Sequence, residues 1–129
     1  MNGLLLNLLT ISLGAAAGAC LRWGLGLAAL RFASPWPLGT LAANWLGAYV
    51  IGLAAAYFAA HSDLPPAYKL LIATGFLGGL TTFSTFSLEA VQLLQAGRYA
   101  DFGTHFVLHT AGCMLLTVLG MASYKGALT

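Results

Sequence analysis

The residues with the clearest chemical potential in this 129-residue sequence lie between Gly75 and Ser87. This stretch holds three glycines and five serines or threonines, a composition that forms helix poorly. We expect a spanning helix to break here, where a Gly-Gly pair at 78–79 is soon followed by a Thr-Thr pair at 81–82. In hydrocarbon such a break must be buried in protein or line a polar cavity, because its free N–H and C=O groups would otherwise go unsatisfied.

A broken membrane helix presents partial charges at its broken ends. The first half-helix ends in carbonyls with partial negative charge, and the second begins with N–H groups with partial positive charge. Two such breaks that face each other across a dimer axis would gather carbonyls around one point and form a cation site, as in the discontinuous helices of transporters. A kink that serves only packing is the alternative, because glycine is frequent in membrane helices.

Aromatic and amide side chains near this break are candidates for contact with an anion. Phe83 and Phe86 are three residues apart and share a helix face, and the electropositive edge of a phenyl ring can meet an anion without a full charge. In the preceding apolar stretch Thr40, Asn44 and Gly47 share one face, and the Asn44 amide offers two donors. Each group also has a structural interpretation, in which the rings pack and the amide bonds a neighbouring helix.

The elements that must position these residues are membrane-spanning helices. Hydrophobic residues make up 60% of the chain and charged residues only 6%, whereas charged residues are about a quarter of a soluble domain. A span needs about 20 apolar residues, so the sequence predicts an all-α membrane protein with one four-helix transmembrane domain over residues 1–129. No positive charge precedes the first apolar run, which favours a span over a signal peptide. The expected spans are 3–30, 38–60, 67–95 and 102–124.

The cations are balanced between the two sides of the membrane. With four spans, one side holds Lys69 and Lys125, and the other holds Arg31 and Arg98, while Arg22 lies inside or near the end of the first span. Orientation is normally set by an excess of Lys and Arg on the cytoplasmic side. We therefore hypothesise dual topology, in which the chain inserts both ways and two copies pair as an antiparallel homodimer. The cations form no basic run, so nucleic-acid binding has no support.

Small residues in the first span predict a close helix contact. The pattern Gly14-x-x-x-Gly18 lets two helix backbones approach each other. Four helices leave little room for a pathway of their own, so a transport path is expected at an interface between subunits. The glycine pattern is interpreted either as part of that interface or as packing within one subunit.

Three sequence patterns together resemble the Fluc family of small dual-topology fluoride channels. They are Gly39-Thr40-Leu41-x-x-Asn44-x-x-Gly47, Gly75-Phe76-x-Gly78-Gly79-x-Thr81-Thr82-Phe83-Ser84-Thr85-Phe86 and Gly14-x-x-x-Gly18-x-x-x-Arg22. The resemblance extends over all four spans. It implies an ion channel of the bacterial cytoplasmic (inner) membrane that lets fluoride leave the cell passively and catalyses no reaction. It further implies an antiparallel homodimer with two pores and a structural sodium ion at the dimer centre.

The resemblance also implies roles for individual residues. The ring edges of Phe83 and Phe86 would line the fluoride path, with Asn44 as a side-chain donor beside them. Fluoride is strongly hydrated, so close donors must replace its water, yet conduction also needs binding weak enough to release the ion. The backbone carbonyls of Gly78 and Thr81 would hold the sodium ion. The remaining expected residues of the polar path are Ser84, Thr85 and Thr40.

Four other residues are expected at a vestibule or along a polar track. Arg22 either draws anions into a vestibule or extends to the lipid headgroups. Glu89 either lines the polar track or faces the membrane–water interface. His105 and His109 lie four apart on one helix face, where hydroxyl side chains are expected in this family. They either line a vestibule, which would make flux depend on pH, or bond neighbouring helices. Two histidines are too few ligands for zinc, and the sequence shows no obvious others.

The main alternative function is a small multidrug-type cation antiporter, which is also four-spanning and of dual topology. Proton-coupled export would need an acid deep in the first span, and this sequence has no acid before Asp63. A subunit that assembles with others and transports nothing is a third interpretation. An enzyme is not expected, because the acids Asp63, Glu89 and Asp101 are dispersed and no nucleophile–base spacing stands out.

Overall fold

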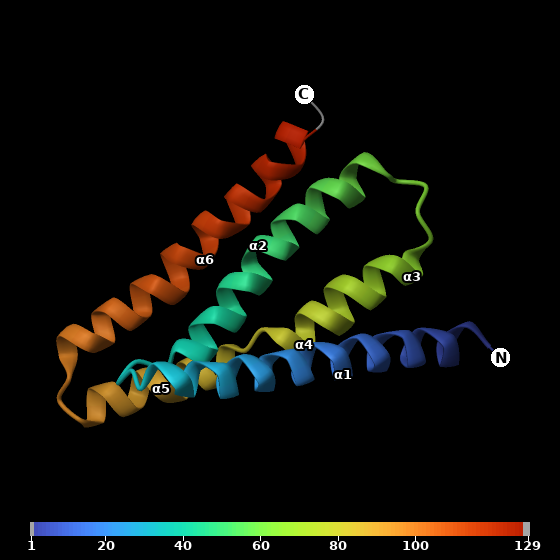
Figure 1. Cartoon of the computed structure of the whole chain (residues 1–129). Helices are drawn as coiled ribbons and strands as arrows, with labels where there is room; N and C mark the ends of the chain where they lie inside the picture. Colours follow the sequence, from blue (N-terminus) through green and yellow to red (C-terminus); the bar gives the residue numbers. More distant parts are fainter. Residues whose placement is uncertain (1, 128–129) are drawn as a thin grey trace.

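The computed structural model describes residues 2–127, which are helical apart from short connections and one break (Figure 1). Four helical segments are long and apolar enough to cross a membrane, as predicted. The first consists of α1 (Gly3–Ala29) and the 3₁₀ turn η1 (Leu30–Phe32), and the second is α2 (Leu38–Ala60). The third consists of α3 (Pro66–Lys69), the π-helical η2 (Leu70–Leu77), α4 (Gly78–Leu80) and α5 (Phe83–Gln95), and the fourth is α6 (Tyr99–Ala127).

Local sequence signals set the ends of these helices. The Asn2 side chain accepts a hydrogen bond from Leu5 N at 2.9 Å and caps the start of α1. Pro66 occupies the first position of α3, where its missing N–H costs no helical bond. Gly97 has φ = 72° and ends α5, and Arg98 N donates back to Leu93 O at 2.9 Å. Glycine suits this position because other residues rarely adopt positive φ.

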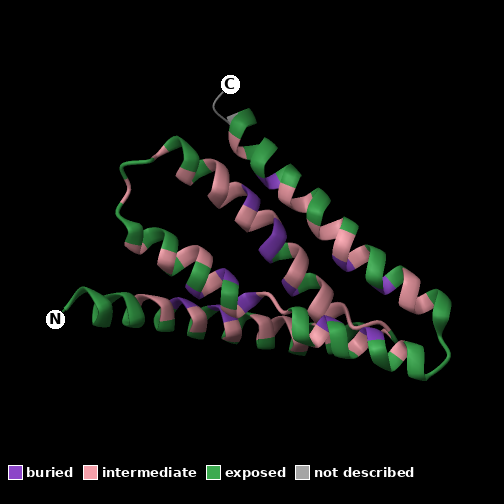
Figure 2. Ribbon diagram, turned by 180° about the vertical axis from the view of Figure 1, so that it is seen from behind, coloured by how far each residue is buried: buried purple, intermediate pink, exposed green. Residues whose placement is uncertain are grey.

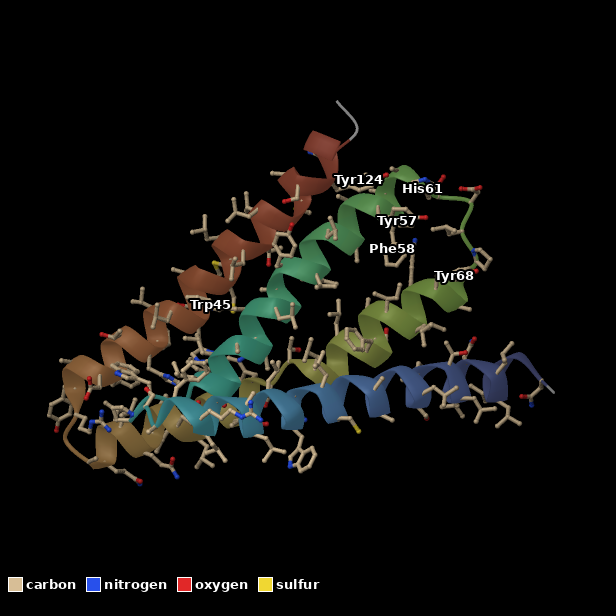
Figure 3. All side chains as sticks on the ribbon, viewed as in Figure 1. Trp45, Tyr57, Phe58, His61, Tyr68 and Tyr124 are labelled. Atoms are coloured by element: carbon tan, nitrogen blue, oxygen red, sulfur yellow. The ribbon has the colours of Figure 1, made fainter. Side chains whose placement is uncertain are left out.

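The helices are arranged as two pairs that meet near α5 (Figure 1). In one pair α6 runs along α2, and in the other α1 runs along η2 and α4. Trp45 joins the first pair by donating from Nε1 to Leu108 O at 2.8 Å (Figure 3). At the far end of this pair, Tyr57 stacks on His61 and meets Tyr124 edge to face, with ring centroids 4.3 and 5.8 Å apart. This cluster is typical of an aromatic belt at a span end.

The glycine pattern of the first span packs within the subunit. Gly14 and Gly18 are both buried against the third span. A Cβ at Gly14 would lie 3.1 Å from the Cα of Gly75, and one at Gly18 would collide with the carbonyl oxygen of Phe76. Gly79 continues the same contact, because a Cβ there would collide with Ala15 O. Of the two interpretations left open by the sequence, the structure supports packing within one chain.

Most of the remaining helix surface is apolar and uncovered. Figure 2 shows that exposed and half-buried positions dominate all the spans, and that buried positions gather where the helices cross. Large apolar side chains such as Leu13, Trp23 and Met114 are each at least 70% exposed. A surface of this kind suits lipid or a second protein chain rather than water.

The contact between the first and third spans is sensitive to a single methyl group. Gly18→Ala should destabilise the protein, because its Cβ would overlap backbone atoms of Phe76 and Leu80. Overpacking of this kind costs about 1–3 kcal/mol, so we expect a lower unfolding temperature in detergent. Gly24→Ala is the control, because within the described residues a Cβ at that position would meet no atom within 4 Å beyond its two chain neighbours and its own turn of helix. Equal unfolding temperatures for the two variants would contradict the packing shown here.

Candidate functional site

The predicted break in the third span is present, and it falls on the two threonines. Thr81 (φ −84°, ψ 157°) and Thr82 (φ −150°, ψ 119°) are extended, between the end of α4 and the start of α5. Gly78 and Gly79 remain helical, so the glycines do not form the break themselves. Threonine suits the position, because its branched side chain favours extended backbone and its hydroxyl can cap the next helix.

The Asn44 side chain on α2 bonds both backbone groups of Thr82. Thr82 N donates to Asn44 Oδ1 at 2.8 Å, and Asn44 Nδ2 donates to Thr82 O at 3.0 Å. The amide therefore pairs with the extended segment as a neighbouring strand would. This pairing satisfies the N–H and C=O groups of Thr82, which the break releases from the helix.

The break also redirects the donors of two carbonyl groups. In an unbroken helix the N–H of Thr82 would bond the carbonyl of Gly78, and the N–H of Thr85 would bond that of Thr81. Here Thr82 N donates to Asn44, and Thr85 N donates to Thr82 Oγ1 at 3.1 Å. The carbonyls of Gly78 and Thr81 therefore lose their helical donors, and their partial negative charges gather at the end of α4.

Arg22 lies against this break. Its Nε donates to the carbonyl oxygen of Gly79 at 3.1 Å, across from α1 to α4. The sequence left open whether Arg22 serves a vestibule or extends to the headgroups. The structure shows a positive side chain bonded to the carbonyl end of a half-helix, which is a favourable pairing of charge and dipole.

The two phenylalanines are adjacent but differ in burial. Their ring centroids are 5.5 Å apart, and Phe83 is 77% exposed whereas Phe86 is 5% exposed. Phe86 packs against the imidazole rings of His105 and His109, with centroids 5.2 and 4.7 Å away. Phe83 begins α5 and extends outward from the chain, so its ring is free to meet lipid or a partner.

A hollow of about 440 Å³ lies between α2, the third span and α6. It brings together four side chains that the sequence singled out, and it is also lined by residues Gly78 and Thr81. The lining residues that sequence reasoning missed include Cys113 and Thr117, which follow His109 at successive spacings of four and so lie on the same helix face. The four expected side chains on its wall are Asn44, Phe83, Phe86 and His109.

Three of the expected hydroxyl groups are engaged within the chain. Thr40 Oγ1 donates to Glu89 Oε1 at 2.6 Å, and Thr40 does not line the hollow. Thr82 Oγ1 donates to Thr85 Oγ1 at 3.1 Å and lies 3.3 Å from Ser84 Oγ. The hydroxyls of Thr82, Ser84 and Thr85 therefore form a short polar chain around the start of α5.

Glu89, His105 and His109 form a cluster that sequence reasoning did not assemble. The histidines are on α6 and are 2% and 6% exposed, and Glu89 reaches them from α5. His105 Nε2 lies 3.5 Å from Glu89 Oε2, and one ligand atom from each residue lies within 4.8 Å of the others. The spacing of the two histidines was visible in the sequence, but no local pattern joins them to an acid on another helix.

Comparison with known proteins identifies the family. The sequence profile of the CrcB-like protein family, described as Camphor Resistance (CrcB), matches residues 9–121. The chain belongs to this family. The match includes residues of all four candidate spans.

Relatives of this CrcB-like chain are similar over nearly their whole length. One from Cupriavidus taiwanensis is 52% identical over 120 residues, which are 93% of this chain and 95% of the relative. One from Chromohalobacter salexigens is 53% identical and covers 95% of this chain and 92% of the relative. One from Pseudomonas aeruginosa is 53% identical and covers 91% and 92%. Each of the three is named "Fluoride-specific ion channel FluC", which confirms the resemblance found in the sequence.

Removing the amide that holds the break should destabilise the protein. Asn44→Ala leaves Thr82 N and Thr82 O, which are partly buried, without the partners shown here, and a polar group left unpaired costs up to about 1–3 kcal/mol when it is fully buried. We expect a clear fall in unfolding temperature in detergent. Asn7→Ala, at an exposed position of α1, is the control and should change the temperature little. If both variants unfolded at the same temperature, the pairing between Asn44 and the break would contribute nothing to stability.

Proposed function

We propose that this protein is a fluoride channel in which two antiparallel copies form two pores and let fluoride leave the bacterial cell passively. The observation that carries the proposal is the broken third span, with Asn44 clamped to it and the Phe83–Phe86 pair beside it. The names of the relatives support the same ion. We place the protein in the cytoplasmic membrane, where such a channel protects the cell.

The hollow offers the graded donors that a small hydrated anion needs. Its wall combines phenyl rings with polar groups and carries no full positive charge from Lys or Arg. Ring edges attract an anion weakly, which permits the release that conduction requires. Both donors of Asn44 are used within the chain, by Thr82 O and His109 Nδ1 at 3.0 and 3.1 Å. In the proposed channel the Asn44 amide donates to fluoride in place of His109 Nδ1. Its bond to Thr82 O is kept, because that bond holds the break in place.

A second copy of the chain would complete the site. The exposed ring of Phe83 stands at the rim of the hollow, and the surrounding helix faces are apolar. The balanced distribution of Lys and Arg supports insertion in both orientations. We therefore propose an antiparallel homodimer in which the partner covers the open side of the hollow.

The residues at the break fit a sodium ion between the two copies. The carbonyls of Gly78 and Thr81 have lost their helical donors, and Gly78 is exposed on the single chain. Unwound backbone carbonyls at half-helix ends are typical sodium ligands in membrane proteins. When bound, sodium would supply fixed positive charge, and the chain's part is to present these oxygens at the dimer centre.

A transport assay with purified protein tests the proposal against its alternatives. Liposomes loaded with fluoride should release it rapidly to an external electrode, and the release should not depend on a proton gradient. Chloride-loaded liposomes are the control for selectivity and should release their anion far more slowly. Release that requires a proton gradient would favour the antiporter, and no release at all would favour the assembly subunit.

The phenyl rings are tested separately. Phe83→Ile and Phe86→Ile should each reduce fluoride release about tenfold, the change produced by about 1.4 kcal/mol of added barrier, because isoleucine lacks an electropositive ring edge. The dimer should persist on size exclusion. Phe32→Ile, at an exposed ring in η1 far along the sequence from the break, is the control. Unchanged release in both hollow variants would remove the rings from the mechanism.

A further inference from the structure

We propose that Glu89, His105 and His109 form a binding site for a divalent transition-metal ion such as zinc, and that metal bound there slows fluoride movement. The first half of this inference rests on the side-chain cluster alone. The second half rests on the proposed function. The site differs from the sodium position in its atoms, because it uses imidazole nitrogen and carboxylate oxygen rather than backbone carbonyls.

The distances within the cluster suit a tetrahedral ion. Zinc binds histidine nitrogen and carboxylate oxygen at about 2.0–2.2 Å, which places two ligands of a tetrahedron about 3.4 Å apart. His105 Nε2 and Glu89 Oε2 are already 3.5 Å apart. His105 Nε2 also lies 3.4 Å from the carbonyl oxygen of Phe86, an acceptor, so metal binding at Nε2 moves the ring proton to Nδ1 and replaces that contact. His109 completes a set whose atoms lie within 4.8 Å of one another, so a small side-chain movement closes it around an ion. Two histidines and one glutamate are a known zinc ligand set that leaves one position open.

Two polar atoms of this cluster await a partner. Within residues 2–127, Glu89 Oε2 and His109 Nε2 are buried and make no hydrogen bond. Leaving buried polar atoms unpaired costs free energy. A cation would pair with Glu89 Oε2 directly, and with His109 Nε2 once the proton that Nε2 carries while Nδ1 accepts from Asn44 has moved. His109 is 6% exposed, so bulk water reaches its ring poorly.

A neighbouring hydroxyl orients the acidic ligand. Thr40 Oγ1 donates to Glu89 Oε1 at 2.6 Å, which turns the other carboxylate oxygen, Oε2, toward the histidines. Metal ligands are commonly held in this way by a hydrogen bond from outside the coordination shell. Thr40, which does not line the hollow, therefore acquires a role as a positioning residue for the metal site.

Metal binding competes with the hydrogen bond between His109 and Asn44. The two bonds to Thr82 fix the orientation of the Asn44 amide, so its Nδ2 donates to His109 Nδ1 at 3.1 Å. Coordination through Nδ1 would occupy the accepting lone pair. Coordination through Nε2 would place the ring proton on Nδ1, where it faces the amide N–H. In both cases the hydrogen bond between Asn44 Nδ2 and the His109 ring is broken.

The same ion would place positive charge beside the proposed fluoride path. Phe86 packs against both histidine rings, with centroids 5.2 and 4.7 Å away, and it lines the hollow. Conduction requires an anion to leave as readily as it enters. A divalent charge next to Phe86 would hold fluoride too tightly, and we therefore infer inhibition rather than activation.

Metal binding is measured first, without reference to transport. Chelator-stripped protein in detergent is titrated with Co²⁺ or Zn²⁺, and heat, bound metal and the visible spectrum of Co²⁺ are recorded. We expect one ion per chain and a Co²⁺ spectrum of four-coordinate type. Glu89→Gln and His105→Gln should each weaken binding about 100-fold, and Thr40→Val, which keeps all three ligands, about tenfold. His61→Gln changes the remaining histidine of the sequence, at the end of α2, and should bind as the parent does.

Two results of the titration would overturn the site. One is parent-like affinity in both Glu89→Gln and His105→Gln, measured on samples that remain monodisperse and unfold at the parent's temperature. The other is loss of binding in His61→Gln. If a ligand variant fails to fold, Thr40→Val still tests the site, because it alters the carboxylate's orientation and removes no ligand.

Transport is measured second, in liposomes with and without micromolar Zn²⁺. Zinc should slow fluoride release by the parent severalfold, a chelator should restore it, and Glu89→Gln should be insensitive. Metal that binds without slowing release would overturn the proposed inhibition and leave the site intact. Absence of fluoride release before zinc is added would instead overturn the proposed function, on which the titration does not depend.

Discussion

Backbone that leaves helical geometry inside a membrane needs partners for its N–H and C=O groups, and here one side chain supplies both. Asn44 accepts from Thr82 N and donates to Thr82 O, so the extended residues between α4 and α5 are held in place from α2. Because Thr82 N is committed to Asn44, the carbonyl of Gly78 has no helical donor. The unpaired carbonyl at the end of α4 is therefore a consequence of the Asn44 side-chain amide. The hydroxyl of Thr82 then caps the start of α5.

The surroundings of the break are asymmetric. On one side α1 approaches so closely that glycines 14, 18, 75 and 79 leave no room for a methyl group, and Arg22 bonds a carbonyl of α4. On the other side the hollow stays open, with the Phe83 ring at its rim. Lipid can cover the apolar helix faces, but it offers no hydrogen bonds to carbonyls. This difference is the physical argument for a second copy as the cover.

The polar residues of three helices form one connected network around Phe86. His109 bonds Asn44 and packs on the Phe86 ring, and His105 approaches the carboxylate that Thr40 holds. His109 is one hydrogen bond away from the amide that secures the break, and His105 contacts the ring of His109, with centroids 4.5 Å apart. In so small a protein the same few polar side chains both hold the break in place and face the proposed ion sites. A substitution at one of them is therefore expected to affect stability and ion binding together.

The sequence by itself determined the four spans and the location of the break. Both depend on local composition: α2 begins and ends where predicted, at Leu38 and Ala60, and the backbone opens at the Thr-Thr pair. Only the tertiary structure decided which faces meet. Helical periodicity places Gly14 and Gly18 on one face, but the crossing of α1 with the third span shows that this face packs within the chain. Glu89 likewise joins His105 only through the packing of α5 on α6, a contact between distant segments that no local pattern encodes.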